Sequence, residues 1–313
     1  MTVAFTFPGQ GSQVVGMGKA LAEAEFEARA VFEAVDDALG EKLSEIIWEG
    51  PIETLTLTEN AQPALMAVSL AALRVLEARG ISIRDSAAYV AGHSLGEYSA
   101  LAAAGALSVS DAARLLRARG RAMQAAVPVG SGAMAALLGM DLDAAKEVAE
   151  QAAEGEVCET ANDNGGGQVV ISGNKTAVER AIVIAQQKGA KRAILLPVSA
   201  PFHCALMAPA ARAMEEALAA VDIKAPVVPL VANVLAAPIS DPAEIRRRLV
   251  EQVTGMVRWR ETVAWLGSAG VNLFVEVGAG KVLSGLARRI VDGAETLAVG
   301  TPADIDAAVA KLG

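Results

Sequence analysis

Histidine and cysteine are scarce in this chain of 313 residues, which contains only two of each. The cysteines, Cys158 and Cys204, lack the spacing of a metal-binding motif and are too few for a disulfide framework. These counts exclude a zinc module and a disulfide-stabilised secreted scaffold. We therefore expect no metal site, and we expect the reducing cytoplasm as the compartment.

Basic residues are also in deficit, because 27 Lys and Arg stand against 36 Asp and Glu, a net charge of −9. Nucleic-acid binding over a broad surface needs an excess of basic residues and is excluded. The N-terminal stretch MTVAFTFPGQGSQ lacks a basic region followed by a long apolar region, and no run of about 18 apolar residues is found. The sequence therefore predicts neither a signal peptide nor a membrane span.

Aromatic residues make up only 4% of the chain, whereas 53% of its residues are hydrophobic, so a large core is expected. Short apolar runs alternate with segments of helical periodicity. We expect strands at Val3–Phe7, Ala87–Ala91 and Asn272–Val277 and in APVVPLVANV, with helices over 19–48, Asn60–Gly80, Leu95–Ala104, Asp111–Ala126, Pro209–Val221, Pro242–Thr254, Trp259–Ala269 and the end of VGAGKVLSGLARRI. The expected cap of the helix Asp111–Ala126 is Ser110 or Asp111. This order predicts an α/β fold with a mostly parallel sheet and helices on both faces.

The middle of the chain follows a different pattern. We expect a strand, a helix, two strands, a helix and a strand at Ala133–Leu138, Asp141–Ala153, Val157–Ala161, Gln168–Ser172, Thr176–Lys188 and Lys191–Val198. A β-α-β-β-α-β order is typical of a ferredoxin-like unit. We therefore predict a small ferredoxin-like subdomain, 129–198, inserted in a large subdomain formed by 1–128 and 199–313.

The stretch GHSLG, residues 92–96, places Ser94 between two glycines, after an expected strand and before an expected helix. It is either a tight turn that happens to hold a serine or a nucleophile elbow, in which a sharp turn exposes the hydroxyl. A serine hydroxyl needs a base to accept its proton. His93 is adjacent to Ser94 and is better suited to a structural hydrogen bond, so His203 is the candidate base.

Seven stretches together resemble the malonyl-CoA:acyl carrier protein transacylases of fatty acid synthesis and, more widely, the acyltransferase domains of polyketide synthases. They occur in family order along the whole chain: FPGQGSQ (7–13), GHSLGEYSAL (92–101), RARGRAMQ (117–124), ANDNGGGQVVISG (161–173), VSAPFHCALM (198–207), LVEQVTGMVRW (249–259) and FVEVGAGKVLSGL (274–286). The resemblance implies a hydrolase-like α/β core with a ferredoxin-like insert.

The resemblance assigns the catalytic roles. Ser94 would be the acylated nucleophile and His203 its base, oriented by main-chain carbonyls instead of a third carboxylate. The main-chain N–H groups of Gln10 and Leu95 would form the oxyanion hole. Arg119 would bind the free carboxylate of a malonyl group, and residue spacing alone does not separate it from the other arginines of its helix, Arg114, Arg117 and Arg121.

The resemblance also gives the remaining substrate-binding candidates, Gln252, Phe202 and His93. The Phe202 ring would favour malonyl over methylmalonyl, or it is simply a core aromatic. Asn162 and Asn164 either match a family motif or are ordinary turn residues. Two departures from the family pattern affect the backbone near the site. Gly165–Gly167 stand where relatives often carry a proline, so that loop is expected to be loose. Gly255-Met256 stand where relatives often have a small residue followed by proline.

The expected activity is transfer of a malonyl group from malonyl-CoA to the phosphopantetheine thiol of an acidic acyl carrier protein, with ping-pong kinetics and no tightly bound cofactor. The pathway is fatty acid or polyketide synthesis, and a monomer is expected. Local basic residues for docking the carrier protein would be Lys188, Lys191, Arg192, Arg288 and Arg289, each of which is otherwise ordinary surface. A serine thioesterase or hydrolase and a non-catalytic acyl-CoA-binding or carrier-protein-binding homologue are the alternatives.

Overall fold

A six-stranded sheet forms the centre of the larger part of the computed structural model, which describes residues 1–313. Its strand order is β10-β9-β1-β2-β7-β8. All neighbouring pairs are parallel except β7 and β8, which are antiparallel. The bounds are β1 Val3–Phe7, β2 Tyr89–Gly92, β7 Leu230–Ala232, β8 Ala237–Ile239, β9 Leu273–Val277 and β10 Glu295–Val299. The predicted, mostly parallel sheet is confirmed.

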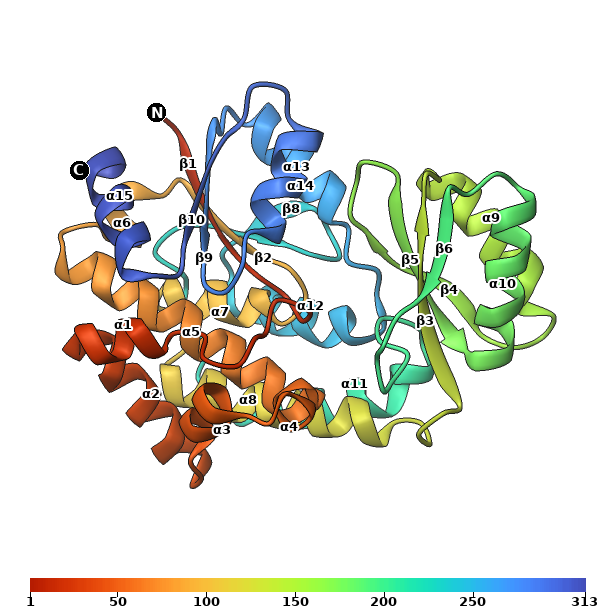
Figure 1. The fold of residues 1–313 in the computed structure, drawn as a ribbon, viewed down its shortest axis with the longest axis horizontal. Helices are drawn as coiled ribbons and strands as arrows, with labels where there is room; N and C mark the ends of the chain where they lie inside the picture. Colours follow the sequence, from red (N-terminus) through yellow and green to blue (C-terminus); the bar gives the residue numbers. More distant parts are fainter.

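Helices cover both faces of this sheet (Figure 1). Strand β1 is buried along its whole length, and its side chains alternate between two cores. Phe5 and Phe7 belong to the larger core, whereas Ala4 belongs to a second core together with Trp259 and Leu283. The larger core contains residues of α2 (Phe26–Leu39), α5 (Thr58–Ala78), α7 (Gly96–Ala103), α8 (Val109–Ala125), α11 (Ala208–Ala219) and α12 (Pro242–Thr254), and the second core those of α13 (Trp259–Ser268) and α14 (Val282–Ile290).

A separate four-stranded antiparallel sheet lies at one end of the molecule, opposite the two termini (Figure 1). Its order is β4-β5-β3-β6, with β3 Gly132–Leu138, β4 Cys158–Asp163, β5 Gln168–Asn174 and β6 Arg192–Leu195. Helices α9 (Leu142–Ala153) and α10 (Lys175–Gln187) contribute to its own hydrophobic core. The ferredoxin-like insert is therefore confirmed, while the boundaries at 128/129 and 198/199 stay predictions.

The helical segment expected over 19–48 is divided into three helices: α1 (Lys19–Ala24), α2 and α3 (Leu43–Glu49). Glu25 has an extended backbone between the first two, and Gly40 adopts a left-handed conformation, with a φ of 66°, at the end of α2. Helix α8 begins at Val109, two residues earlier than predicted, because Ser108, and not Ser110 or Asp111, accepts the cap hydrogen bond from the Asp111 N–H. Periodicity alone does not detect such interruptions.

Several short or late elements were not expected from the sequence. They are α4 (Ile52–Thr56), α6 (Ile83–Ser86), the 3₁₀ turn η1 (Ala205–Met207), β8, β10 and α15 (Pro302–Leu312). Strand β6 is shorter than the predicted Lys191–Val198. Helix α15 does carry a sequence signal, since Thr301 and Asp304 form a capping box at its start.

Helix α5 is long and apolar enough by composition to cross a membrane, contrary to the expectation that no stretch would be. However, 83% of its apolar window is buried inside the fold. Its apolar character is accounted for by its central place among α2, α7 and α8 in the larger core.

Candidate active site

Ser94 lies in the sharp turn between β2 and α7. Its φ of 52° is in the left-handed region, which non-glycine residues rarely adopt. A Cβ added at Gly92 would lie 1.9 Å from the carbonyl carbon of Gly96, and one added at Gly96 would lie 2.2 Å from the Phe7 carbonyl oxygen. Both glycines are therefore required for the close approach of helix and strands, which is the geometry of a nucleophile elbow.

His203 lies beside Ser94, although 109 residues separate them in the sequence. Its Nε2 is 2.7 Å from the Ser94 Oγ. Its Nδ1 faces two main-chain carbonyl oxygens, 2.9 Å from that of Gln252 and 3.1 Å from that of Gly255. Carbonyls only accept, so Nδ1 carries the proton and Nε2 is left to accept the Ser94 hydroxyl proton. The ring is thus oriented by carbonyls, as the family resemblance implied.

The surroundings of His203 keep its ring neutral. The residue is 4% exposed. Burial, and after it the positive charge of Arg119, lower the pKa of His203 to about 3, although the Gln252 carbonyl opposes this shift. A neutral imidazole at neutral pH is the form that can act as a base.

Arg119 comes from α8 and is 1% exposed. Its Nη2 donates to the Ser94 Oγ at 3.1 Å and to the Gln252 Oε1 at 2.8 Å, and its Nη1 donates to the Gln62 Oε1 at 2.7 Å. All three acceptors are uncharged, and no carboxylate forms an ion pair with this guanidinium. A buried charge without a counter-ion is costly, so the site is prepared for an anionic group beside Ser94.

Two main-chain N–H groups near Ser94 donate to no acceptor within the chain. They belong to Gln10, on the loop after β1, and to Leu95, directly after the serine. The side chain of Gln10 is held by Thr58, whose hydroxyl donates to it at 2.9 Å. Both residues line the same cavity as Ser94 and His203. Free N–H donors in that place are what an oxyanion hole requires.

The cavity around these groups has a volume of about 570 Å³. Among the predicted site residues it is lined by Gln10, His93, Ser94, Leu95, Arg119, Phe202 and His203, and also by Asn162 and Asn164. The His93 Nε2 lies 2.9 Å from the Asn164 Oδ1, and burial lowers the pKa of His93. Gln252 is fully buried behind this lining and contacts Ser94, Arg119 and His203 instead.

The comparisons with known proteins agree with this geometry. A family model described as an acyl transferase domain matches residues 4–301. The chain belongs to the acyl transferase domain family. A Bacillus subtilis (strain 168) protein named malonyl CoA-acyl carrier protein transacylase is 49% identical over 311 residues, which are 99% of this chain and 97% of that protein.

Solved structures of similar proteins support the same assignment. The crystal structure of an acyl-carrier-protein-S-malonyltransferase from Bartonella henselae is 62% identical, with a TM-score of 0.98 over 100% of both chains. A malonyl-transacylase solved in complex with its type II polyketide synthase acyl carrier protein is 41% identical, with a TM-score of 0.96 over 99% of this chain and 100% of that one.

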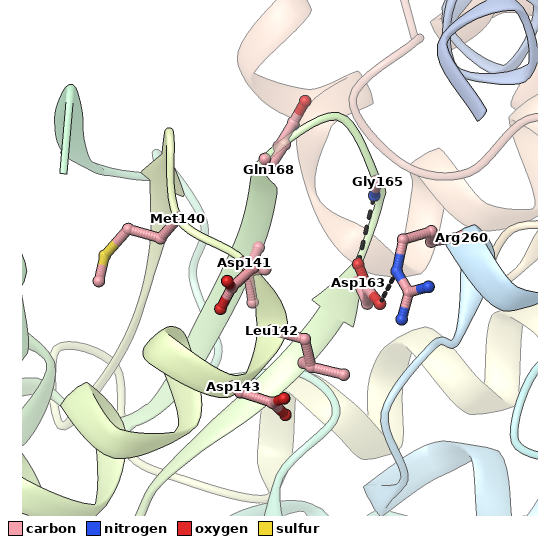
Figure 2. A pocket seen from close by; sticks show the side chains of 10 residues that line it. Met140, Asp141, Leu142, Asp143, Asp163, Gly165, Gln168 and Arg260 are labelled. Atoms are coloured by element: carbon pink, nitrogen blue, oxygen red, sulfur yellow. Dashed lines mark hydrogen bonds and ion pairs between the residues drawn. The ribbon is translucent and has the colours of Figure 1, made fainter.

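A second, smaller cavity of about 360 Å³ lies where the small sheet of this acyl transferase meets α13. Figure 2 shows the Asp163 carboxylate between the Gly165 N–H and the Arg260 guanidinium. Asp163 is buried, and its carboxylate accepts from the Arg260 Nε at 2.7 Å. Main-chain bonds join the same segments, since Val257 donates to Ala161 and accepts from Asp163. These contacts tie β4 to the segment that holds the Gly255 carbonyl.

The loop of three glycines that was expected to be loose is buried at Gly165 and exposed at Gly166, and its looseness stays a prediction. Gly165, Gly166 and Gly167 all have positive φ, at 77°, 60° and 72°. A Cβ at Gly165 would lie 2.8 Å from Ile290, and one at Gly166 would lie 3.2 Å from Arg289. The run of left-handed residues and the contact with the end of α14 both favour glycine here.

Three polar residues of the acyl transferase site were not singled out from the sequence: Gln62, Glu97 and Asn233. The Asn233 Oδ1 accepts from the Ser94 N–H at 2.8 Å. Burial raises the pKa of Glu97 to about 7, opposed by its hydrogen bonds with Gln252 and Asn233. Gln62 and Glu97 are polar residues near the starts of otherwise apolar helices, and that was the available signal.

The five basic residues considered for docking are all exposed. Lys188 pairs with Glu147 at 3.2 Å, and Arg288 donates to the Thr296 hydroxyl. Arg289 lies against Gly166, which places the end of α14 beside the small sheet. The positive charges therefore occur both on the small subdomain and on α14.

Proposed function

We propose that this acyl transferase moves a malonyl group from malonyl-CoA to the phosphopantetheine thiol of an acyl carrier protein, through a malonyl ester on Ser94. The observation that carries the proposal is the buried guanidinium of Arg119, which has no carboxylate partner and lies 3.1 Å from the nucleophile. An acyl chain ending in a carboxylate supplies that partner, and the relatives named above support the same substrate.

In the first half-reaction, the Ser94 hydroxyl attacks the thioester carbonyl while His203 Nε2 accepts its proton. The developing oxyanion is stabilised by the N–H groups of Gln10 and Leu95, each worth about 3 kcal/mol of transition-state stabilisation. The tetrahedral intermediate collapses, the C–S bond breaks, and His203 returns its proton to the departing coenzyme A thiolate. The product is a malonyl ester on Ser94.

In the second half-reaction, the carrier protein's thiol enters the cavity and gives its proton to His203. The thiolate attacks the malonyl ester through the same oxyanion hole, and the Ser94 oxygen leaves and takes the proton back. Each substrate thus reacts in turn at one site, so ping-pong kinetics are expected. No tightly bound cofactor is needed for either step.

Arg119 is proposed to fix the orientation of the acyl group as well as to select it. Two parallel N–H bonds to the malonyl carboxylate hold the chain at its far end. The ester carbonyl then faces the oxyanion hole and the incoming thiol. Phe202 is proposed to limit the space available to an α-methyl group, and His93, held by Asn164, to line the path of the substrate.

We further propose an acidic acyl carrier protein as the partner, consistent with the relative solved in complex with a carrier protein of polyketide synthesis. Lys188, Lys191, Arg192, Arg288 and Arg289 would supply its docking charges. The proposed setting is the cytoplasm, with fatty acid or polyketide synthesis as the pathway and a monomeric enzyme.

Intact-protein mass spectrometry after mixing with malonyl-CoA tests this function. Wild-type protein should gain one malonyl group on Ser94 and lose it when phosphopantetheinylated carrier protein is added. Ser94→Ala should gain none. Rapid loss of the adduct to water without carrier protein would instead identify a hydrolase, and absence of any adduct would contradict the proposal.

A further inference from the structure

Glu97 is a buried carboxylate that the proposed reaction does not use. It lies on α7, three residues after Ser94, and is 1% exposed. Its Oε1 accepts from the Asn233 N–H at 3.3 Å, and its Oε2 accepts from the Gln252 Nε2. Each oxygen therefore faces an N–H donor, an arrangement that suits the ionised carboxylate. No basic residue forms an ion pair with it.

The two partners of Glu97 lead to the reacting groups. Asn233 accepts from the Ser94 N–H through Oδ1 and donates to the Gly92 carbonyl at 2.6 Å through Nδ2. Asn233 thus holds both sides of the strained turn. Glu97 itself contacts only the main-chain N–H of Asn233, so this branch acts on the backbone.

Gln252, the second partner of Glu97, contacts more of the site residues. Its Nε2 also donates to the Ser94 carbonyl at 2.9 Å, and its Oε1 accepts from the Arg119 Nη2 at 2.8 Å. Its main-chain carbonyl accepts from His203. One residue therefore joins the proposed nucleophile, base and carboxylate-binding group, and the Glu97 carboxyl group is the end of that chain of contacts.

We propose that Glu97 is a positioning residue that sets the orientation of the Gln252 amide. Through this amide it affects how Arg119 binds the substrate carboxylate. A carboxylate accepts and a guanidinium only donates. The Gln252 amide between them satisfies both only with its NH₂ toward Glu97 and its oxygen toward Arg119. The reverse orientation places donors against donors at Arg119 and oxygen against oxygen at Glu97.

A neutral amide at position 97 removes the carboxylate acceptor and leaves the Gln252 NH₂ held only by the Ser94 carbonyl and, at 3.4 Å, by the Asn233 Oδ1. In Glu97→Gln, one end of the new amide must place N–H groups against either the Asn233 N–H or the Gln252 NH₂. Turning Gln252 relieves that contact but presents its NH₂ to Arg119. If Gln252 turns, Arg119 loses its fixed acceptor, and substrates with a carboxylate are affected more than substrates without one.

The test rests on the proposed function and compares malonyl-CoA with acetyl-CoA, which share everything except the carboxylate. We expect Glu97→Gln to lower the ratio of kcat/KM for malonyl transfer to that for acetyl transfer by about 10-fold. Glu97→Asp, which retains the charge, should recover part of the ratio. An unchanged ratio in a folded Glu97→Gln protein would overturn the inference.

Glu276→Gln is the matched control. Glu276 is also a fully buried carboxylate that accepts from two N–H groups, those of Leu283 and Ser284, but it does not contact the Arg119 network. Its substitution should lower stability without moving the malonyl-to-acetyl ratio. An equal change of the ratio in this control would show a general packing effect and overturn the positioning role.

Gln252→Met provides a second test of the inference, whether or not Glu97→Gln folds. It removes the amide while Glu97 stays in place, and we expect the same selective loss of malonyl transfer. In that background, Glu97→Gln should add little, because the two residues act in series. Full additivity, or an unchanged ratio in Gln252→Met, would overturn the inference. Absence of malonyl transfer in wild type would contradict the proposed function instead.

Discussion

The chemistry at the scale of single residues depends on which groups donate and which accept. His203 Nδ1 faces the carbonyl oxygens of Gln252 and Gly255, and this alone decides that Nε2 is the basic nitrogen. Arg119 is surrounded by uncharged acceptors and so keeps its charge available for a substrate. Ser94 combines both effects, because it donates to His203 and accepts from Arg119.

A first prediction concerns the two histidines. Because burial lowers the pKa of His203 to about 3, its ring should stay neutral between about pH 8 and about pH 5, and His93, whose pKa burial also lowers, should titrate below its ordinary value. With only two histidines, nitrogen-detected NMR can follow each ring, and substitution of His93 assigns the signals. Titration of His203 near its ordinary pKa of 6.5 would contradict this account.

The lowered pKa of His203 also makes the free energy of unfolding depend on pH. The folded-state pKa of His203 lies below the unfolded value, so the unfolded chain binds more protons as the pH falls below about 6.5. The contribution of His203 therefore makes the free energy of unfolding decrease from about pH 6.5 toward about pH 3. Above that range this residue contributes no pH dependence.

At the scale of elements, the β2–turn–α7 unit was predicted from the sequence to within two residues at each end. Two glycines around a serine, an apolar run before and an alanine-rich helix after were sufficient, because the close contacts at Gly92 and Gly96 leave little choice of residue. The divisions of the first helical segment were missed, since the extended backbone of Glu25 has no distinctive sequence signal. The cap was missed because Ser108 and Ser110 are equally good capping residues.

Glycine substitutions test whether the turn between β2 and α7 is closely packed. Gly92→Ala places a methyl group 1.9 Å from the backbone of Gly96 and should destabilise the fold by about 3 kcal/mol and abolish activity. Gly285→Ala is the matched control, because Gly285 lies inside helix α14 with no atom near its added Cβ, and it should stabilise by about 1 kcal/mol. Thermal or urea unfolding measures both. Equal effects of the two changes would show that the elbow is not closely packed.

At the scale of the whole molecule, the site is assembled from distant segments. Ser94 follows β2, Arg119 lies on α8, and His203 comes after the ferredoxin-like insert. The sequence predicted the nucleophile and the base from the elbow and the scarcity of histidine. It could not select Arg119 among four arginines of one helix, and the choice rested on the family resemblance. Gln62, Glu97 and Asn233 were missed because their roles arise only from contacts across the fold.

The ferredoxin-like insert also contacts the larger part of the molecule close to the site. The β4 contacts with Val257 and the Asp163–Arg260 ion pair join the small sheet to the segment that supplies the Gly255 carbonyl to His203. The order of strands and helices expected in the insert predicted its topology, but not the close approach of Gly165 and Gly166 to the end of α14. Such contacts join segments built around two different sheets and leave no periodic pattern in the sequence of either.

The central claim is that Arg119 holds the carboxylate of an acyl group on Ser94. The most direct measurement is the transfer of malonyl and acetyl groups by wild type, Arg119→Lys and Arg119→Ala. We predict that Arg119→Ala lowers kcat/KM for malonyl-CoA about 100-fold more than that for acetyl-CoA, and that lysine recovers only part of the loss. An equal fall for both substrates would contradict the claim.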